Sequence, residues 1–376
     1  MGITIGVAGG QGLIGQGVCK ALIEGGRVDR IVVLDLKTTG RIERIEEKIV
    51  DIYNRVDLVK ELKEVDLVVN IVAPYYKHGT VVADTALEAG IHYVDACADI
   101  NITKALLAQD EIWKKTGITL LTGLGASPGI TNLLVKKLAP RFDEALEAHV
   151  VWVTGGQELE REDSGHDDSG GGTLQDFIRE EFGEIPTYID GKYVTVTGFL
   201  GGAEKIKFGD TIVPVYHSGH SEPITIPQFI PGIRTASCKG NVVPFGFTQL
   251  IRKAREIGLN SEKRIKVEGH KISPFQFLNA YLYDRISYQN YDLESLKFMG
   301  GIHVRVVGIR NGKKDTEVET ILADRNTDMT RSTAIPIAVV SEAIAYGEVT
   351  RRGAYAPEAL DAKLAEKFLE EILRRR

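Results

Sequence analysis

Short apolar runs alternate with segments of helical periodicity through the first third of the chain. Five runs are near-continuous, as in parallel strands buried on both faces, at residues 3–8, 31–34, 67–72, 91–94 and 118–121. The segments between them predict helices by apolar spacing or charge patterning, at residues 41–48, 56–63, 80–89 and 102–115. This alternation predicts an α/β fold built on a doubly wound parallel sheet, the Rossmann arrangement.

The rhythm changes after about residue 125 and becomes rich in strands. Strands are predicted at residues 148–153, 193–197, 205–208, 211–215, 303–310 and 316–323, and helices at residues 131–139, 249–257 and 275–283. Asn311-Gly312 joins the last two strands, which is a strong hairpin signal. The pattern therefore predicts a second, α+β domain with a mixed or antiparallel sheet. The tail, residues 333–345 and 357–373, is helical again.

A glycine fingerprint follows the first strand at once. The pattern G-x-G-x-x-G falls on Gly10, Gly12 and Gly15, just before a helical run. We expect Gly10 to permit a tight turn, Gly12 to let the backbone approach a pyrophosphate, and Gly15 to let the helix pack closely. The free N–H groups at the helix start would face the phosphates. The residues assigned to the cofactor here are Gly10, Gln11, Gly12, Leu13 and Ile14.

Asp35 ends the second strand and follows Gly15 by twenty positions. An acid at this place accepts hydrogen bonds from the ribose hydroxyls of NAD and repels the extra phosphate of NADP. The alternative is a solvated turn residue in a plain crossover. Lys37 and Arg41 lie just beyond and could tolerate a 2′-phosphate. The sequence favours NAD and leaves NADP open.

Composition narrows the class of protein. The chain has 376 residues and a formal net charge of −6, which gives no basic surface for nucleic acid. No apolar run is long enough to span a membrane, and the N-terminus enters a strand directly, so we expect no membrane and no targeting segment. Three widely spaced cysteines predict neither disulfides nor a metal motif, which favours the cytoplasm. The expected partner is a small molecule.

Several candidate residues follow strands of the predicted parallel sheet, where ligands bind. Ala73 and Pro74 should line the nicotinamide through their backbone. Asp95 would hold a substrate ammonium or orient a proton relay, unless it is a helix cap or turn acid. Tyr76 and His78, with Tyr75 beside them, would shuttle a proton, unless they serve in packing.

The second domain offers further candidates. Asn132 would bind a substrate carboxylate or cap its helix. Arg234, with Lys239 nearby, would bind a carboxylate or lie solvated on the surface. His217 and His220 are three positions apart in a strand-rich region, a spacing that suits a metal only on a helix, so no metal site is expected. Residues 163–172 are either a flexible linker or an active-site loop, and the sequence leaves both interpretations open. Cys97 is expected to be a small buried side chain.

The sequence resembles the saccharopine dehydrogenase-like oxidoreductases, a group that includes saccharopine reductases, lysine 6-dehydrogenases and carboxynorspermidine dehydrogenases. Four stretches carry the resemblance and span nearly the whole chain in the family's order. They are residues 9–15; residues 70–74 (NIVAP) with 90–95 (GIHYVD); residues 125–132 (GASPGITN); and residues 330–336 (TRSTAIP) with the segment that continues to Pro357-Glu358.

The resemblance implies a discontinuous NAD(P)-binding Rossmann domain, residues 1–124 with 328–376, onto which the C-terminal helices return. It implies that residues 125–327 bind substrate and form a homodimer. The implied chemistry is hydride transfer between a nicotinamide and the CH–NH or CH–NH2 carbon of an amino acid. We expect the lysine 6-dehydrogenase type, in lysine metabolism. The alternatives are reductive condensation of the saccharopine or carboxynorspermidine type, and a non-catalytic NAD-sensing protein.

Overall fold

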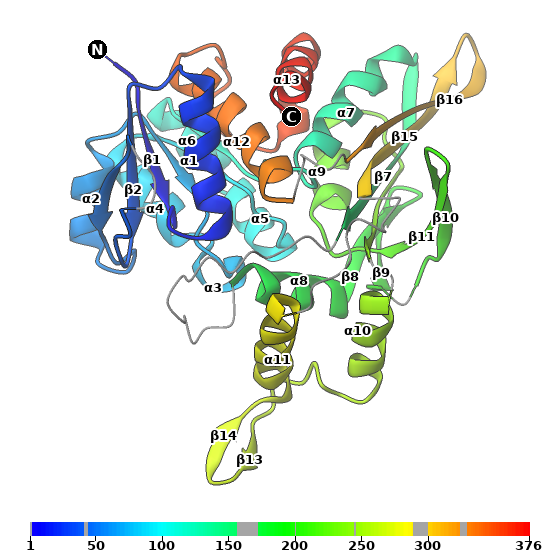
Figure 1. Cartoon of the computed structure of the whole chain (residues 1–376). Coiled ribbons are helices and arrows are strands. Elements are labelled where there is room, and N and C mark those ends of the chain that lie inside the picture. Colours follow the sequence, from blue (N-terminus) through cyan, green and yellow to red (C-terminus); the bar gives the residue numbers. More distant parts are fainter. Residues whose placement is uncertain are drawn as a thin grey trace.

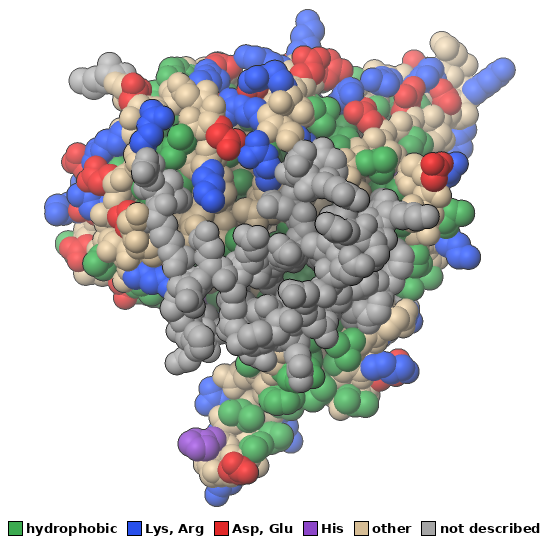
Figure 2. All heavy atoms as spheres, in the orientation of Figure 1, with side chains coloured by type: hydrophobic (Ala, Val, Ile, Leu, Met, Phe, Trp, Pro, Cys, Tyr) green, Lys and Arg blue, Asp and Glu red, His purple; other side chains and the backbone are tan. Residues whose placement is uncertain are grey.

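The computed structural model describes residues 2–40, 44–155, 172–199, 201–243, 246–288, 300–323 and 329–376. Two large sheets dominate it, one built from the beginning and end of the chain and one from the middle (Figure 1). Among the described residues, no helix is both long and apolar enough to cross a membrane. Basic and acidic side chains are interspersed over the upper part of the face drawn in Figure 2, which fits the modest net charge.

The first sheet has seven strands, and every neighbouring pair in it is parallel. Its order across the sheet is β17 (Gly353–Tyr355), β6 (Thr119–Leu121), β5 (His92–Asp95), β4 (Leu67–Asn70), β1 (Thr4–Ala8), β2 (Arg30–Asp35) and β3 (Glu46–Ile49). The chain winds outward in both directions from β1, so β1 and β4 flank the point where the order reverses. A ligand crevice is expected there, beyond the carboxyl ends of these two strands.

Helices cover both faces of this sheet, as the apolar pattern predicted. One face packs on α1 (Leu13–Gly25), α12 (Met329–Ala345) and α13 (Ala362–Arg375). The other packs on α2 (Arg55–Leu62), α4 (Val81–Ala89), α5 (Ile100–Leu107) and α6 (Asp110–Thr116). The C-terminal segment therefore returns to the dinucleotide-type sheet, adding the strand β17 and the helices α12 and α13.

The second sheet is mixed, which confirms the predicted architecture. Its main order is β10 (Glu204–Phe208), β11 (Thr211–His217), β12 (Thr235–Val243), β7 (Glu144–Gly155), β15 (Gly300–Arg310) and β16 (Lys313–Leu322), with β8 (Glu184–Ile189) and β9 (Lys192–Thr197) joined through β12. Only the β12–β7 pair is parallel. The predicted hairpin joins β15 to β16, with positive φ at both Asn311 and Gly312.

Helices connect and extend this second half. The helix α7 (Ile130–Leu138) and the short α9 (Glu222–Phe229) share a continuous apolar core with both sheets. A smaller core joins α8 (Gly172–Phe182), α10 (Gly246–Glu256) and α11 (Pro274–Tyr288). Together with the hairpin of β13 (Ile265–Val267) and β14 (His270–Ile272), α10 and α11 project from the body of the molecule (Figure 1).

Two local predictions were wrong. The helix predicted at 41–48 is contradicted by the part that the structure describes, because residues 46–49 form the edge strand β3. The charges of this strand pair across the surface, Glu46 with both Arg30 and Lys48. The predicted helix 102–115 is two helices, α5 and α6. The N-cap of α5 is Asp99, whose carboxylate accepts the N–H groups of Asn101 and Ile102.

The end of the chain differs in a smaller way. Pro357 begins a single 3-10 turn, η3 (Pro357–Ala359), and not the last helix. The helix α13 starts only after Asp361, whose side chain caps its first turn. The strands β8, β12 and β17 were not predicted, because their apolar residues are few or interrupted by polar and glycine positions.

Candidate active site

The loop between β1 and α1 has the shape that the glycine fingerprint requires. The left-handed turn lies at Gly9, with φ of +79°, one position before the glycine to which the sequence assigned it. A Cβ at Gly10 would lie 2.7 Å from the Val33 side chain, and one at Gly15 would lie 2.3 Å from the Gly9 carbonyl oxygen. The helix therefore packs directly on the loop, as predicted for Gly15.

The same loop leaves room for a phosphate. At Gly12 an added Cβ would meet only the Gly9 carbonyl oxygen, at 3.4 Å, so the space over this residue is open. No side chain caps the N-terminus of α1, so its first-turn N–H groups stay available to an anion. Ile14 is buried while Leu13 is 44% exposed at the loop surface. A pyrophosphate fits this cradle.

Asp35 stands at the end of β2, beside the glycine loop. Its Oδ2 accepts the N–H of Gln11 at 2.9 Å, and its Oδ1 accepts the N–H of Leu36 at 2.7 Å. The carboxylate is partly exposed and lies next to the place where a ribose would follow the pyrophosphate. Lys37 is exposed nearby, whereas Arg41 lies outside the described residues.

The segment after β4 faces the glycine loop across the reversal point. A Cβ at Gly9 would lie 2.9 Å from the carbonyl oxygen of Ile71. Ala73 is partly exposed and Pro74 is buried, and they lead into the short helix α3 (Tyr75–His78). The Tyr75 hydroxyl donates to the Asn70 carbonyl and accepts the Ala96 N–H, which ties this segment to the end of β5. Ala73 and Pro74 thus follow β4 at the reversal point, and their contact with the nicotinamide stays a prediction.

Asp95 is completely buried at the end of β5. Its carboxylate accepts four hydrogen bonds, from the Tyr93 hydroxyl, the Thr122 hydroxyl and the N–H groups of Cys97 and Gly123, all between 2.9 and 3.0 Å. Burial raises the pKa of Asp95, and these donors counter the rise. The carboxylate holds the ends of β5 and β6 together, and both of its oxygens are already bonded within the protein. Cys97 is also fully buried, as expected.

Tyr76 and His78 diverge from the same short helix. The Tyr76 hydroxyl lies 3.4 Å from Gln175 Oε1, and the Arg179 guanidinium lies over the Tyr76 ring at 4.3 Å, so Tyr76 faces α8. The Nδ1 of His78 lies 2.7 Å from the Tyr53 hydroxyl, on the cofactor half. Burial lowers the pKa of His78, with help from Lys77. The structure brings Tyr76, and not His78, toward the middle of the molecule.

Asn132 and Arg234 differ in burial and in their partners. Asn132 is fully buried: its Oδ1 accepts the Gly129 N–H, and its Nδ2 donates to Glu358 Oε2 at 2.9 Å. It thereby ties α7 to the C-terminal segment. Arg234 is exposed at the start of β12. Lys239 is bound to Glu204 at 2.7 Å. These residues do not meet in one site, and residues 163–171 lie outside the described residues.

Three carboxylates of α8 form a feature that the sequence did not reveal. We call Asp176, Glu180 and Glu181 the α8 carboxylates. Asp176 and Glu181 are 7% and 0% exposed, and Asp176 Oδ1 and Glu181 Oε2 have no hydrogen-bond partner among the described residues. Glu180 is partly exposed, and none of the described residues forms a hydrogen bond or ion pair with its carboxylate. Asp176 Oδ2 accepts the Tyr75 N–H at 2.8 Å, which places α8 against the segment after β4.

The electrostatics of this group are unusual. Burial raises the pKa of Asp176 to about 7, and it raises the pKa of Glu181 to about 8. Burial, with repulsion from Asp176, Glu181, Asp99 and Glu222, holds the pKa of Glu180 well above its ordinary value. No Lys or Arg among the described residues forms an ion pair with the α8 carboxylates. Such a cluster is suited to a cationic ligand. The only sequence signal for this cluster is the spacing of the acids at positions 176 and 180, which places them on one face of a helix.

Family models match nearly the whole chain. Residues 5–121 match the saccharopine dehydrogenase NADP binding domain, and residues 125–375 match the saccharopine dehydrogenase C-terminal domain. The chain belongs to the saccharopine dehydrogenase family. The resemblance seen in the sequence is thereby confirmed, and so is a nicotinamide cofactor, for which the loop after β1 provides the cradle.

Two members of known name are similar to this protein over nearly its whole length. Carboxyaminopropylagmatine dehydrogenase from Synechocystis sp. is 23% identical over 415 residues, covering 96% of this chain and 94% of that protein. The apo saccharopine dehydrogenase (L-Glu forming) from Saccharomyces cerevisiae is 15% identical, covers 100% of this chain and 98% of that chain, and superposes with a TM-score of 0.67. At this identity the superposition concerns the fold. The chain is therefore an oxidoreductase of this family, and its N-terminal part is an NADP-binding domain.

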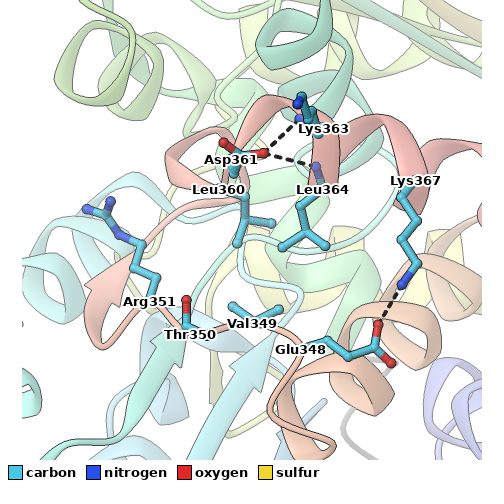
Figure 3. Close-up of a pocket in the computed structure, with 9 residues that line it drawn as sticks. All are labelled: Glu348, Val349, Thr350, Arg351, Leu360, Asp361, Lys363, Leu364 and Lys367. Carbon is cyan, nitrogen blue, oxygen red and sulfur yellow. Dashed lines mark hydrogen bonds and ion pairs between the residues drawn. The ribbon is translucent and has the colours of Figure 1, made fainter.

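A surface hollow of about 420 Å³ lies elsewhere in this protein (Figure 3). Residues 348–351 line one side of it and the start of α13 lines the other. Three of its charged groups already have partners: Lys367 pairs with Glu348, and Asp361 caps α13. Because residues 348–351 precede β17, the hollow lies toward the amino ends of the parallel strands, away from the cofactor crevice.

Proposed function

We propose that this protein is a nicotinamide-dependent dehydrogenase that transfers a hydride between the cofactor and the CH–NH or CH–NH2 carbon of an amino acid with a cationic arm. The family supplies the reaction class. The α8 carboxylates carry the choice of substrate, because buried carboxylate oxygens without partners need a proton or a cation. An ammonium or guanidinium group provides the cation and several N–H donors.

The position of α8 supports this assignment. Asp176 is bonded to the backbone of Tyr75, directly after the Ala73–Pro74 segment that we assign to the nicotinamide side. A substrate whose cationic arm lies against α8 would therefore place its other end toward the cofactor crevice. When bound, the cofactor accepts or donates the hydride, and the chain's own task is to hold the reacting carbon beside it.

Proton handling is assigned to groups near α8. Glu180 is partly exposed and has no partner among the described residues, and burial raises its pKa well above its ordinary value, so we assign it the exchange of a proton when a cation approaches. Tyr76 faces the same helix and stays our candidate for proton transfer. Asp95 is assigned a positioning role, because its four hydrogen bonds fix the strand ends below the crevice.

The direction of the reaction has two candidates. Oxidation of a diamino acid such as lysine was our expectation from the sequence. The three α8 carboxylates favour a substrate with more than one cationic nitrogen, and the Synechocystis relative is named for agmatine, which carries a guanidinium. Reductive condensation, the same hydride step in the other direction, is therefore the second candidate. A non-catalytic NAD sensor predicts binding without turnover.

Three finer assignments belong to the same proposal. Asp35 favours NAD over NADP through its place beside Gln11. A homodimer is supported by exposed apolar residues on the projecting helices: Leu250 on α10, Ile257 just after it, and Phe277 and Tyr281 on α11. A cytoplasmic location is supported by three cysteines that are all free and buried.

The test follows reduced nicotinamide by absorbance with NAD or NADP. The amine panel is lysine, ornithine, saccharopine, diaminopimelate, carboxynorspermidine and carboxyaminopropylagmatine; matching keto-acid or aldehyde plus amine pairs test condensation. We expect turnover with a substrate that has a cationic arm, and a loss of at least roughly 100-fold in kcat/KM in Glu181→Gln, equivalent to about 3 kcal/mol.

The matched control is Glu370→Gln, at an exposed glutamate of α13. It should leave kcat/KM unchanged. Dinucleotide affinity should be the same in both variants, because α8 lies outside the glycine loop. Equal turnover in Glu181→Gln and the parent would refute the assigned role of α8, and silence across both panels with intact dinucleotide binding would favour the sensor.

A further inference from the structure

Three side chains from separate segments converge beneath α8. His220 lies in the loop after β11, Glu222 begins α9, and Cys238 lies within β12. One His nitrogen, one carboxylate oxygen and the sulfur all lie within 4.8 Å of one another. The residues are 9%, 0% and 2% exposed. Imidazole, carboxylate and thiol are ligand types for transition metals, and here they meet in the interior.

The Glu222 carboxylate is only half satisfied. Its Oε1 accepts hydrogen bonds from the Ser127 hydroxyl at 2.5 Å and the Thr131 hydroxyl at 2.9 Å. Its Oε2 is buried and has no hydrogen-bond partner among the described residues. The two hydroxyls fix the carboxylate with one oxygen left over. A buried carboxylate oxygen without a partner is costly unless a cation or proton meets it.

His220 is held in place by stacking and lies between two carboxylates. Its ring stacks on Trp152, with centroids 5.1 Å apart and planes 10° apart. Its Nδ1 lies 3.4 Å from Ser127 Oγ, on the Glu222 side, and its Nε2 lies 3.7 Å from Glu181 Oε1. Metal-bound histidines commonly present their second nitrogen to a carboxylate, which fixes the ring and raises its basicity.

We propose that His220, Glu222 and Cys238 bind a divalent transition metal ion of the zinc class. The mixed nitrogen, oxygen and sulfur donors suit such an ion, whereas Mg²⁺ and Ca²⁺ prefer oxygen alone. Binding forms the metal–sulfur bond as the Cys238 thiol gives its proton to solvent, and burial raises the pKa of this thiol well above its ordinary value until a metal binds. The thiolate and Glu222 together neutralise the two charges of the ion.

This site is separate from the cation recognition proposed above. The α8 carboxylates keep their unpartnered oxygens for a substrate, because Glu181 contributes only Oε1 toward His220. The sequence did not predict the site, since it paired His220 with His217. His217 is not part of the group, and the partners come from positions 222 and 238. Three protein ligands leave at least one coordination position open, as in catalytic zinc sites.

The test begins with metal analysis of the full chain, purified without chelator and dialysed. We expect about one zinc ion per chain. Replacement with Co²⁺ should give a thiolate-to-cobalt charge-transfer band and visible d–d bands. Cys238→Ser should remove the thiolate band and weaken metal retention at least tenfold, and His220→Asn should weaken retention while it keeps the thiol. Cys19→Ser, at a buried cysteine of α1, is the control and should retain both.

Circular dichroism and thermal melting show whether each variant folds, and His220→Asn serves if Cys238→Ser does not. The proposal is overturned if the parent protein holds substantially less than one ion per chain and gives no thiolate band with Co²⁺. It is equally overturned if His220→Asn and Cys19→Ser retain metal alike. Because these readouts need no substrate, they are independent of the proposed dehydrogenase activity.

Discussion

The glycine loop after β1 and the α8 carboxylates, to which we assign the cofactor and the cationic arm of the substrate, are built in opposite ways. The loop offers backbone N–H groups and open space, and the charged side chain beside it, Asp35 at the end of β2, is already bonded to the backbone of Gln11. The α8 carboxylates offer side-chain charge with few hydrogen-bond partners: Asp176 and Glu181 each have one oxygen without a partner among the described residues. The part that we assign to the cofactor is therefore made mainly of backbone, and the part that we assign to the substrate is made of side-chain charge.

This difference has a physical cause. A pyrophosphate can be recognised by N–H groups and a helix N-terminus, which cost no buried charge. A cationic nitrogen needs acceptors, and buried acceptors repel one another until the cation arrives. We therefore expect the loop to tolerate an empty site with no loss of stability, whereas the α8 carboxylates keep raised pKa values until they are occupied.

The largest expected effect comes from converting a paired buried carboxylate into an unpaired one. Glu342 is fully buried and binds Arg375, which is 10% exposed, through two hydrogen bonds. Arg375→Met should lower the free energy of unfolding by about 3 kcal/mol or more, because the carboxylate loses its cation. Arg374→Met, at the exposed neighbour, should cost less than about 0.5 kcal/mol. Chemical denaturation measures both, and equal costs would contradict the argument.

The next effect separates binding from stability within the glycine loop. Gly12→Ala adds a methyl group that fits the protein, so the melting temperature should hold while dinucleotide affinity falls roughly 10- to 100-fold. Gly15→Ala forces a Cβ to within 2.3 Å of a carbonyl oxygen and should destabilise the fold by roughly 1–3 kcal/mol. Calorimetric titration with NAD and thermal melting distinguish the two. A destabilised Gly12→Ala with normal affinity would show that the space over Gly12 is not for the pyrophosphate.

A third effect is a pH dependence of stability. The pKa of Glu181 is raised to about 8 in the folded protein, so the folded state binds more protons than the unfolded state between about pH 5 and pH 8. Stability from this group is therefore lost as pH rises. Glu181→Gln should gain stability relative to its parent across this range, by at least about 1 kcal/mol. Denaturant titrations at several pH values measure the gain. The control is Glu370→Gln, whose stability relative to the parent should not change with pH.

The smallest effect concerns the cofactor's ribose. Asp35→Ser should lower affinity for NAD about 3- to 10-fold and relax discrimination against NADP, because the variant loses one ribose acceptor and one negative charge. Titration with both dinucleotides gives the ratio of affinities. An unchanged ratio would remove Asp35 from the assignment of cofactor preference.

Sequence reasoning reached the cofactor half because its signals are local. The fingerprint, the strand that ends at Asp35 and the loop after β4 each lie within a few residues of the feature they predict, and the parallel sheet brings them together. The exact turn residue was missed by one position, since only the backbone shows that Gly9 has a positive φ.

The rest of the site depends on contacts between distant segments. The Ser218 hydroxyl donates a hydrogen bond to Glu181, and the Cys238 sulfur lies within 4.8 Å of a Glu222 carboxylate oxygen. The pairing of distant strands creates these contacts, and no short sequence pattern predicts them. The position of Asp95 at the end of a strand was predicted from the sequence. The four groups that donate hydrogen bonds to its carboxylate, from residues 93, 97, 122 and 123, were not. Position along the chain predicts where a residue lies better than whether it is free to act.

Proton release on substrate binding tests the central claim most directly. With cofactor bound at pH 7, the amino acid that turns over is titrated calorimetrically in buffers of different ionisation enthalpy. Asp176, with a pKa of about 7, and Glu181, with a pKa of about 8, carry protons before binding, and a cationic arm should displace them. The account predicts net proton release that Glu181→Gln reduces. Binding without proton release, unchanged in that variant, would contradict it.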